Sequence, residues 1–287
     1  VARQSFGTVN VSNPGSYCGQ SYRVGTGAAL GDLVGMPHGK PDWKNSRFGL
    51  FIGTSPAQSG NPFQRTGREL AEARSRPENA YRYVVVSPML PTSSNHASGD
   101  NSRWLPVKPA SDLALAMGLI RWIIDNERYD TGFLTQPGPA AMQAAGEAAW
   151  SNATHLLVND PDHPRYGQFL RGVDIGLPAP APADDGTPTD DVYVVQAADG
   201  SLVAHTLAAP AELLVERELD LPGADGQAPT PVAVCSAFAK LRAESHRKSL
   251  AEYSDLCGVP VNEIEALAHA FTSHGKKAVA NSHGGTM

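Results

Sequence analysis

Short apolar runs alternate with polar loops along the first half of the chain. RFGLFIG (47–53) is an apolar run that stops at a glycine, and YRYVVVSP (81–88) is a β-branched run that ends in small residues. Runs of this length, rich in β-branched and aromatic residues, are typical of buried strands. The pattern therefore predicts one strand in each segment.

Two segments in the same region carry apolar residues at helical spacing. In residues 63–76, Leu70 and Ala73 lie three positions apart and would share one face of a helix. In DLALAMGLIRWIIDN (112–126), a helix can begin after Ser111, whose side chain is a common N-cap. The apolar positions expected on one face of this second helix are Leu113, Met117, Ile120 and Ile124.

The order strand, loop, helix, strand, loop, helix is typical of a parallel sheet with crossover helices. The sequence therefore predicts an α/β protein with a three-layer αβα, Rossmann-like fold and a mainly parallel sheet. In such sheets ligands bind beyond the carboxyl ends of the strands. The loops expected at this one edge follow Ile52, Val86, Val107 and Ala280.

The composition and the hydrophobic pattern change in the middle of the chain, between about residues 150 and 231. LPAPAPADDGTPTDD (177–191) has the composition of a linker, and VYVVQAADGSLVAH (192–205) alternates across an Asp-Gly turn as a β-hairpin does. A second strand pair is expected in 212–234. We interpret 150–231 as a small, peripheral, β-rich insertion in one domain that spans 1–287.

After this insertion the helical pattern resumes. Residues 237–253 and 261–273 are each predicted to form one helix, and KKAVANSHGG (276–285) is predicted to form a strand that ends in glycine. A parallel strand followed by glycine normally leads into another helix, and the sequence begins with Val1 rather than methionine. We therefore expect the chain to be an internal piece of a longer polypeptide.

Composition narrows the classes of partner. The 287 residues are 41% hydrophobic and 18% charged, with a net charge of −6, and no basic cluster is interleaved with aromatic residues. Nucleic acid and anionic membrane surfaces are therefore not favoured as partners. Three cysteines are too few for a disulfide framework or a four-thiolate zinc site.

The residues alone leave the chemistry open. The strand-end loops are rich in Gly, Ser, Thr and Asn, and such residues allow the backbone to approach phosphate oxygens closely. However, GTSPAQSG (53–60) does not match the dinucleotide motif G-x-G-x-x-G, and tight turns explain the composition of these loops equally well. Asp112 is either a residue that stabilises the helix start or one that recognises a base. Cys18 is an inert thiol, a nucleophile or a soft metal ligand whose other ligands come from a cofactor.

Several motifs resemble the molybdopterin oxidoreductase family, also called the dimethyl sulfoxide reductase family. They are GSYCGQSYRVGTGAALGDL, KPDWKNSRFGLFIGTSPAQSGNPF, YVVVSP, RWLPVKPASDLALAMGLIRWIIDNERY and SHGGTM. In this family a longer catalytic subunit holds molybdenum between two molybdopterin guanine dinucleotides, with one side chain as a further metal ligand. The chain resembles the third domain of such a subunit.

The resemblance implies a role for individual residues. Cys18 corresponds to the metal ligand, and the pair Ser111 and Asp112 to the residues that bind guanine. The loop that approaches the dinucleotide phosphates corresponds to Gly53, Thr54, Ser55 and Pro56, and the loop near the pterin and metal to His283 and Gly284. Where relatives have Asp-Pro-Arg, this chain has Ser87-Pro88-Met89, so weaker hydroxyl contacts are expected from Ser87, Thr92 or Ser93.

The resemblance also implies an activity for the longer protein, a molybdenum-dependent oxidoreductase. This activity is the two-electron reduction of tetrathionate, a small anionic sulfur substrate, to two thiosulfates in anaerobic respiration, with Arg23 and Arg47 as candidate cations near the metal. The alternatives are a related enzyme for polysulfide, thiosulfate or an arsenic oxyanion, and a non-catalytic nucleotide-binding module. The resemblance further implies an iron-sulfur cluster in the missing N-terminal part, an iron-sulfur electron-transfer subunit, a membrane quinol-oxidising subunit and a periplasmic location. The piece alone is expected to bind no cofactor and to be inactive.

Overall fold

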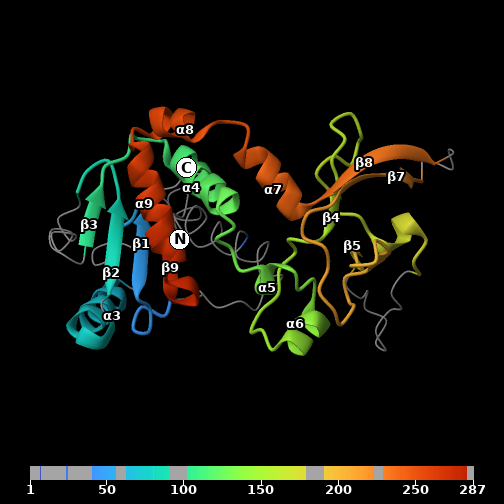
Figure 1. Cartoon of the computed structure of the whole chain (residues 1–287). Coiled ribbons are helices and arrows are strands. Elements are labelled where there is room, and N and C mark those ends of the chain that lie inside the picture. Colours follow the sequence, from blue (N-terminus) through green and yellow to red (C-terminus); the bar gives the residue numbers. More distant parts are fainter. Residues whose placement is uncertain are drawn as a thin grey trace. The chain divides into compact units, whose positions relative to one another are not determined.

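The protein is represented by a computed structural model that divides into two compact units (Figure 1). Unit 1 comprises Val1–Leu113, Cys257–Val259 and Ser273–Met287, and unit 2 comprises Ala114–Leu256 and Pro260–Thr272. The residues that the structure describes are 7, 24, 41–55, 63–79, 81–90, 102–178, 191–222 and 229–282. The predicted insertion, 150–231, lies wholly within unit 2; its status as an insertion stays a prediction.

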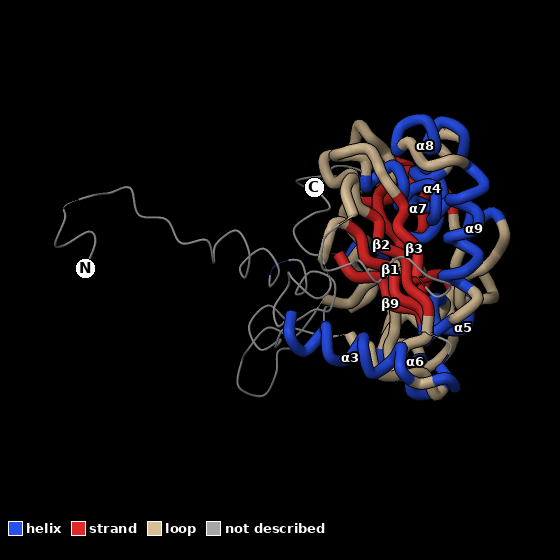
Figure 2. Tube along the Cα trace, turned by 90° about the vertical axis from the view of Figure 1, so that its left-hand side faces the viewer, coloured by secondary structure: helices blue, strands red, loops and turns tan. Residues whose placement is uncertain are grey.

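Unit 1 contains a four-stranded parallel sheet with the strand order β3-β2-β1-β9 (Figure 2). Its strands are β1 (Phe48–Ile52), β2 (Arg82–Val86), β3 (Ser102–Leu105) and β9 (Ala278–Ser282). The chain runs outward from β1 to β3 on one side, and β9 adds to the other side. The predicted α/β class with a mainly parallel sheet is confirmed, and the strand order reverses between β1 and β9, where open α/β sheets bind ligands.

The carboxyl ends of these four strands are level. Ile52 is opposite both Val86 and Ser282, and Val86 is opposite Leu105. The loops that follow the strands therefore begin at one edge, as expected, although β3 ends at Leu105 and β9 at Ser282 rather than at the predicted positions. Pro106 explains the earlier end of β3, because proline has no N–H group for the ladder.

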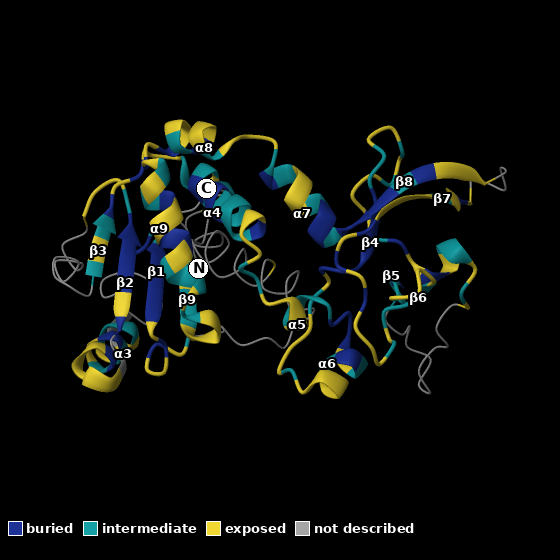
Figure 3. Ribbon diagram, viewed as in Figure 1, coloured by how far each residue is buried: buried dark blue, intermediate teal, exposed yellow. Residues whose placement is uncertain are grey.

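The core of unit 1 lies between the sheet and α3 (Phe63–Ser75), which leads into the short 3-10 helix η2 (Pro77–Asn79). Leu70 and Ala73 are buried, which confirms the predicted apolar face of this helix. They belong to a cluster with Trp43, Phe51, Tyr81, Tyr83 and Val85. Strands β1 and β2 are buried along almost their whole length (Figure 3), as in parallel sheets covered on both faces.

A glycine interrupts the apolar sequence of β1 for a steric reason. A Cβ atom at Gly49 would lie 2.3 Å from the Tyr81 hydroxyl oxygen and 3.1 Å from Phe51 Cε2. Both neighbours are buried aromatic side chains of the same cluster. Glycine in a strand often marks such a close approach, and here it makes room for the Tyr81 hydroxyl.

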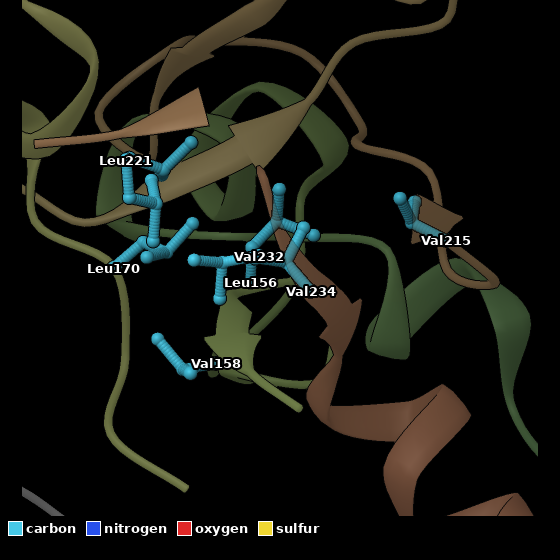
Figure 4. Packing of buried hydrophobic residues seen from close by; sticks show 8 residues of the cluster. Leu156, Val158, Leu170, Val215, Leu221, Val232 and Val234 are labelled. Carbon is cyan, nitrogen blue, oxygen red and sulfur yellow. The ribbon is translucent and has the colours of Figure 1, made fainter. Parts of the chain in front are cut away.

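Unit 2 contains a three-stranded antiparallel sheet and a separate two-stranded hairpin. The sheet has the order β4 (Leu156–Val158), β8 (Thr230–Ser236), β7 (Glu216–Leu221), and the hairpin pairs β5 (Val194–Gln196) with β6 (Leu202–Ala204). Both strand pairs predicted in this region are confirmed. Aliphatic side chains from the sheet and its neighbouring loops form one core cluster (Figure 4), which includes Leu156, Val158, Leu170, Val215, Leu221, Val232 and Val234.

Helix α4 (Asp112–Asp125) begins in unit 1 and continues into unit 2. The other helices of unit 2 are α5 (Thr131–Leu134), α6 (Pro139–Ala145), the 3-10 helix η4 (Gly172–Ile175), α7 (Ala237–Ser245), α8 (Leu250–Cys257) and α9 (Val261–Thr272). In unit 1 the 3-10 helix η6 (Gly275–Lys277) precedes β9. No helix within the described residues is long and apolar enough to span a bilayer.

The predicted buried face of α4 is partly wrong. Leu113 is 74% exposed, and Met117 and Ile120 are only half-buried. The buried residues are Leu115, Gly118, Leu119 and Ile124. A Cβ at Gly118 would contact Tyr253 and Ile264 at 3.4 and 3.5 Å, so the side of α4 that contains Gly118 faces the neighbouring helices. Because apolar residues occur all around this helix, their spacing could not show which side is buried.

The single helix predicted over 237–253 is also wrong, because the structure has two helices there. The second helix, α8, begins with a capping box, in which the Glu252 N–H donates to Ser249 Oγ at 3.2 Å and the Glu252 carboxylate accepts the Ser249 N–H at 2.7 Å. This S-x-x-E pattern is a known sign of a helix start. It was present in the sequence and could have located the break.

Candidate functional site

The carboxyl edge of the unit 1 sheet begins with the loop after β1. Gly53 has φ +61°, a left-handed conformation that glycine adopts at low cost, and its N–H donates to the Val86 carbonyl at 2.9 Å. The chain turns out of the sheet there. Thr54, which is buried, and Ser55 follow, so a backbone turn and two hydroxyl groups lie at this edge, where the resemblance places phosphate contacts.

The loop after β2 is anchored to β3. The Ser87 N–H donates to the Leu105 carbonyl at 3.3 Å, and the Ser87 carbonyl accepts a hydrogen bond from Trp104 Nε1 at 2.9 Å. Both main-chain groups of Ser87 are thus used by the sheet. The hydroxyl contact of Ser87 with a ligand stays a prediction.

The loop between β3 and α4 is a tight turn. The Lys108 carbonyl accepts the Ser111 N–H at 3.3 Å and the Ser111 hydroxyl at 2.6 Å. Between them Pro109 starts the turn and Ala110 has φ +58°, which is uncommon for a residue with a side chain. The hydroxyl proton of Ser111 is therefore committed to the turn, and only its oxygen can accept a further hydrogen bond.

Residues 257–259 brace this turn from behind. The Lys108 N–H donates to the Cys257 carbonyl at 2.9 Å. Gly258 has φ +74°, and a Cβ there would lie 3.0, 3.3 and 3.1 Å from Cγ, Cδ and Cε of Lys108. The aliphatic part of Lys108 therefore lies along a surface that only glycine leaves free, and the loop before α4 is held in one conformation.

Asp112 is the first residue of α4 and is half-buried. No donor within the described part of the chain contacts its carboxylate, so this side chain is not used as a hydrogen-bonding cap. A carboxylate at a helix N-terminus is stabilised by the helix dipole. It can also accept two parallel N–H bonds from an amidine edge such as that of guanine.

The Gly53 loop follows β1 and the loop to Asp112 follows β3, and these two strands are two strand spacings, or about 10 Å, apart. The donor set fits the nucleotide end of a molybdopterin guanine dinucleotide, because backbone and hydroxyl groups suit phosphate and ribose, and a carboxylate suits guanine. Within the described residues no group of three or more His, Cys, Asp or Glu could hold a metal.

The structure places Arg47 at the opposite edge of the sheet. Its N–H donates to the Lys277 carbonyl at 2.8 Å, and its carbonyl accepts the Arg82 N–H at 2.9 Å, both at the amino ends of the strands. Six residue steps, or about 20 Å of extended chain, separate it from Gly53. The predicted role of Arg47 as a cation near the metal stays a prediction.

The other predicted site residues lie outside the described residues. They are Cys18, Arg23, Pro56, Thr92, Ser93, His283 and Gly284. Sequence reasoning missed Lys108 and Gly258, which the structure brings together at the edge. Lys108 lies inside the motif RWLPVKPASDLALAMGLIRWIIDNERY, but no sequence signal connects it with Gly258, which is far away along the chain.

Two further cysteines, Cys235 and Cys257, lie within the described residues; both are buried, and neither forms a disulfide. Burial raises the pKa of the Cys235 thiol and of the Cys257 thiol. At Cys257 the Val259 N–H and the charge of Lys108 oppose that rise only in part. A buried thiol with a raised pKa is a poor nucleophile and a poor metal ligand, so neither cysteine is a catalytic candidate.

Comparison with known proteins gives relatives along the whole chain, although no family model matches it. A tetrathionate reductase chain from Salmonella typhimurium is 50% identical over 286 residues, which are 100% of this chain and 26% of that protein. A selenate reductase chain from Mesobacillus selenatarsenatis is 30% identical over 99% of this chain and 25% of its own length. The chain belongs to the molybdopterin oxidoreductase family.

Other members of the molybdopterin oxidoreductase family are more distant. A sulfite dehydrogenase chain from Allochromatium vinosum is 26% identical over 93% of this chain and 24% of that protein. The chain thus spans about a quarter of the length of the curated relatives it matches. Membership confirms the resemblance seen in the motifs.

Proposed function

We propose that the protein containing this chain is the catalytic subunit of a molybdenum-dependent oxidoreductase that reduces tetrathionate to thiosulfate. The observation that carries this proposal is the 50% identity with the Salmonella tetrathionate reductase chain along the whole sequence. In the proposed reaction, tetrathionate takes up two electrons, its central S–S bond breaks, and two thiosulfate ions leave. No atom is gained or lost.

In this proposal the chain binds and orients the nucleotide end of the cofactor. The Gly53 turn, with Thr54 and Ser55, holds phosphate oxygens, while the Asp112 carboxylate accepts N–H bonds from guanine. The molybdenum with its two molybdopterin guanine dinucleotides supplies the two-electron chemistry when bound. Cys18 as the protein ligand of the metal, with His283 and Gly284 close by, stays a prediction from the motif.

The assembly and its location are proposed from the same family. Each of the three relatives is named as one subunit of its enzyme, which supports an assembly of several different chains. We propose an iron-sulfur cluster in another part of the catalytic subunit, an iron-sulfur electron-transfer subunit, a membrane quinol-oxidising subunit and a periplasmic location. Electrons would pass from quinol through the iron-sulfur centres to the catalytic subunit.

A second candidate substrate is selenate, because the relative at 30% identity is named a selenate reductase. Both substrates are dianions that accept two electrons, so the identity of the family cannot separate them. The test is to purify the full-length protein, measure molybdenum per chain, and follow oxidation of a reduced viologen dye by each substrate. About one molybdenum per chain with faster turnover of tetrathionate supports the proposal. Protein without molybdenum, or turnover of selenate alone, contradicts it.

A further inference from the structure

The carboxyl edge of unit 1 has one positively charged side chain within its described part. That part consists of 53–55, 87–90, 106–112 and 257–259, and its charged side chains are Lys108 and Asp112. A dinucleotide brings a negatively charged pyrophosphate to this edge. Of the charged side chains in this described part, Asp112 repels such a pyrophosphate and Lys108 attracts it.

Lys108 is held at several points of its loop. Its N–H donates to the Cys257 carbonyl, its carbonyl accepts both the N–H and the hydroxyl of Ser111, and its side-chain carbons lie along Gly258. An exposed lysine normally keeps its rotamer freedom, and fixing the side chain costs conformational entropy. The stem lies against Gly258, which limits its rotamers on that side, so less entropy is lost when the ammonium group binds an anion.

We propose that the Lys108 ammonium group donates a hydrogen bond to a phosphate oxygen of the dinucleotide bound at this edge. The proposal rests on the proposed function, because it needs that cofactor. Lysine is a common partner of phosphate as a point charge, and a charge-assisted hydrogen bond is stronger than a neutral one. This role differs from the one predicted for Arg23 and Arg47, which is to hold the anionic substrate near the metal.

The test compares Lys108→Met with Lys277→Met in the full-length protein. Methionine keeps the aliphatic contact with Gly258 and removes the charge, whereas Lys277 is an exposed lysine at the amino edge of the same sheet. Guanine nucleotide per chain is measured after acid hydrolysis of the folded fraction from gel filtration. Its rate of release is also followed at increasing salt concentration.

We expect Lys108→Met to release the nucleotide roughly tenfold faster, as for loss of one charge-assisted hydrogen bond, and to weaken the salt dependence. Lys277→Met should behave as the unsubstituted protein, and Lys108→Arg should restore retention. Equal release from the two methionine variants would overturn the role of Lys108 but not the proposed function. Absence of guanine nucleotide from the unsubstituted protein would overturn both.

Discussion

Alanine at position 49 should destabilise the parallel sheet through a single contact. The new Cβ would lie 2.3 Å from the Tyr81 hydroxyl oxygen, a separation that real side chains do not show. Tyr81 is 2% exposed and lies in the core cluster, so its ring has little room to move. Overpacking of this kind costs about 1–3 kcal/mol, against which alanine gains about 0.4–1 kcal/mol by restricting the unfolded chain. We expect Gly49→Ala to cost about 1–2 kcal/mol.

Removing the hydroxyl should relieve most of that cost. In a Tyr81→Phe background, the nearest atoms to the new Cβ are Phe51 Cε2 at 3.1 Å and the ring carbon Cζ at 3.4 Å. The Tyr81 hydroxyl has no hydrogen-bond partner of normal geometry within the described residues, although Ser46 lies near enough to lower its pKa slightly against the rise caused by burial. Tyr81→Phe alone should therefore be neutral or stabilising, because an unsatisfied buried group is costly.

The assay is a double-mutant cycle. Thermal unfolding of the four variants, with hydrogen exchange of β1 amides as the local measure, should give a coupling energy of about 1 kcal/mol or more between positions 49 and 81. Tyr83→Phe is the matched control: Tyr83 pairs with Gly49 across the strands, but its hydroxyl is not among the three atoms nearest to the new Cβ. If Gly49→Ala costs the same in the wild-type, Tyr81→Phe and Tyr83→Phe backgrounds, the steric explanation of this glycine is wrong.

Three more predictions concern other parts of the chain. His155 is buried, which lowers its pKa to about 4. Because an unfolded histidine titrates near 6.5, the contribution of His155 to stability is complete above pH 6.5, and about 3 kcal/mol of it is lost as the pH falls toward 4. The His155→Gln variant should therefore lose less stability than the wild type on acid unfolding. Gly258→Ala should destabilise the protein by about 1–2 kcal/mol because of the left-handed backbone alone, and by more because the new Cβ contacts Lys108. Gly200→Ala is the control for the backbone effect, because Gly200 has φ +84° and open space around it. Equal melting temperatures for the two variants would exclude an effect of the Lys108 contact. Asp112→Asn should weaken nucleotide retention in the full-length protein by about 1–3 kcal/mol, whereas unchanged nucleotide content would leave Asp112 as a residue of the helix start only.

Much of the local structure could be predicted from the sequence. The strands at 48–52 and 82–86, helix α3 and its buried face, and both antiparallel pairs of unit 2 follow from apolar periodicity and turn residues, which act over a few positions. The family could likewise be recognised from motifs that lie within continuous segments. The break before α8 also has a local signal, the S-x-x-E pattern of Ser249 and Glu252.

Only the tertiary structure decided which stripe of α4 is buried and where Lys108 lies. Each depends on a partner far away in the sequence: Tyr253 and Ile264 facing Gly118, and Gly258 beneath the stem of Lys108. Periodicity describes a helix or a strand by itself, and it carries no information about which distant residue completes a contact. The sequence thus determined the elements and the family, while packing between remote segments determined the arrangement of charges at the carboxyl edge.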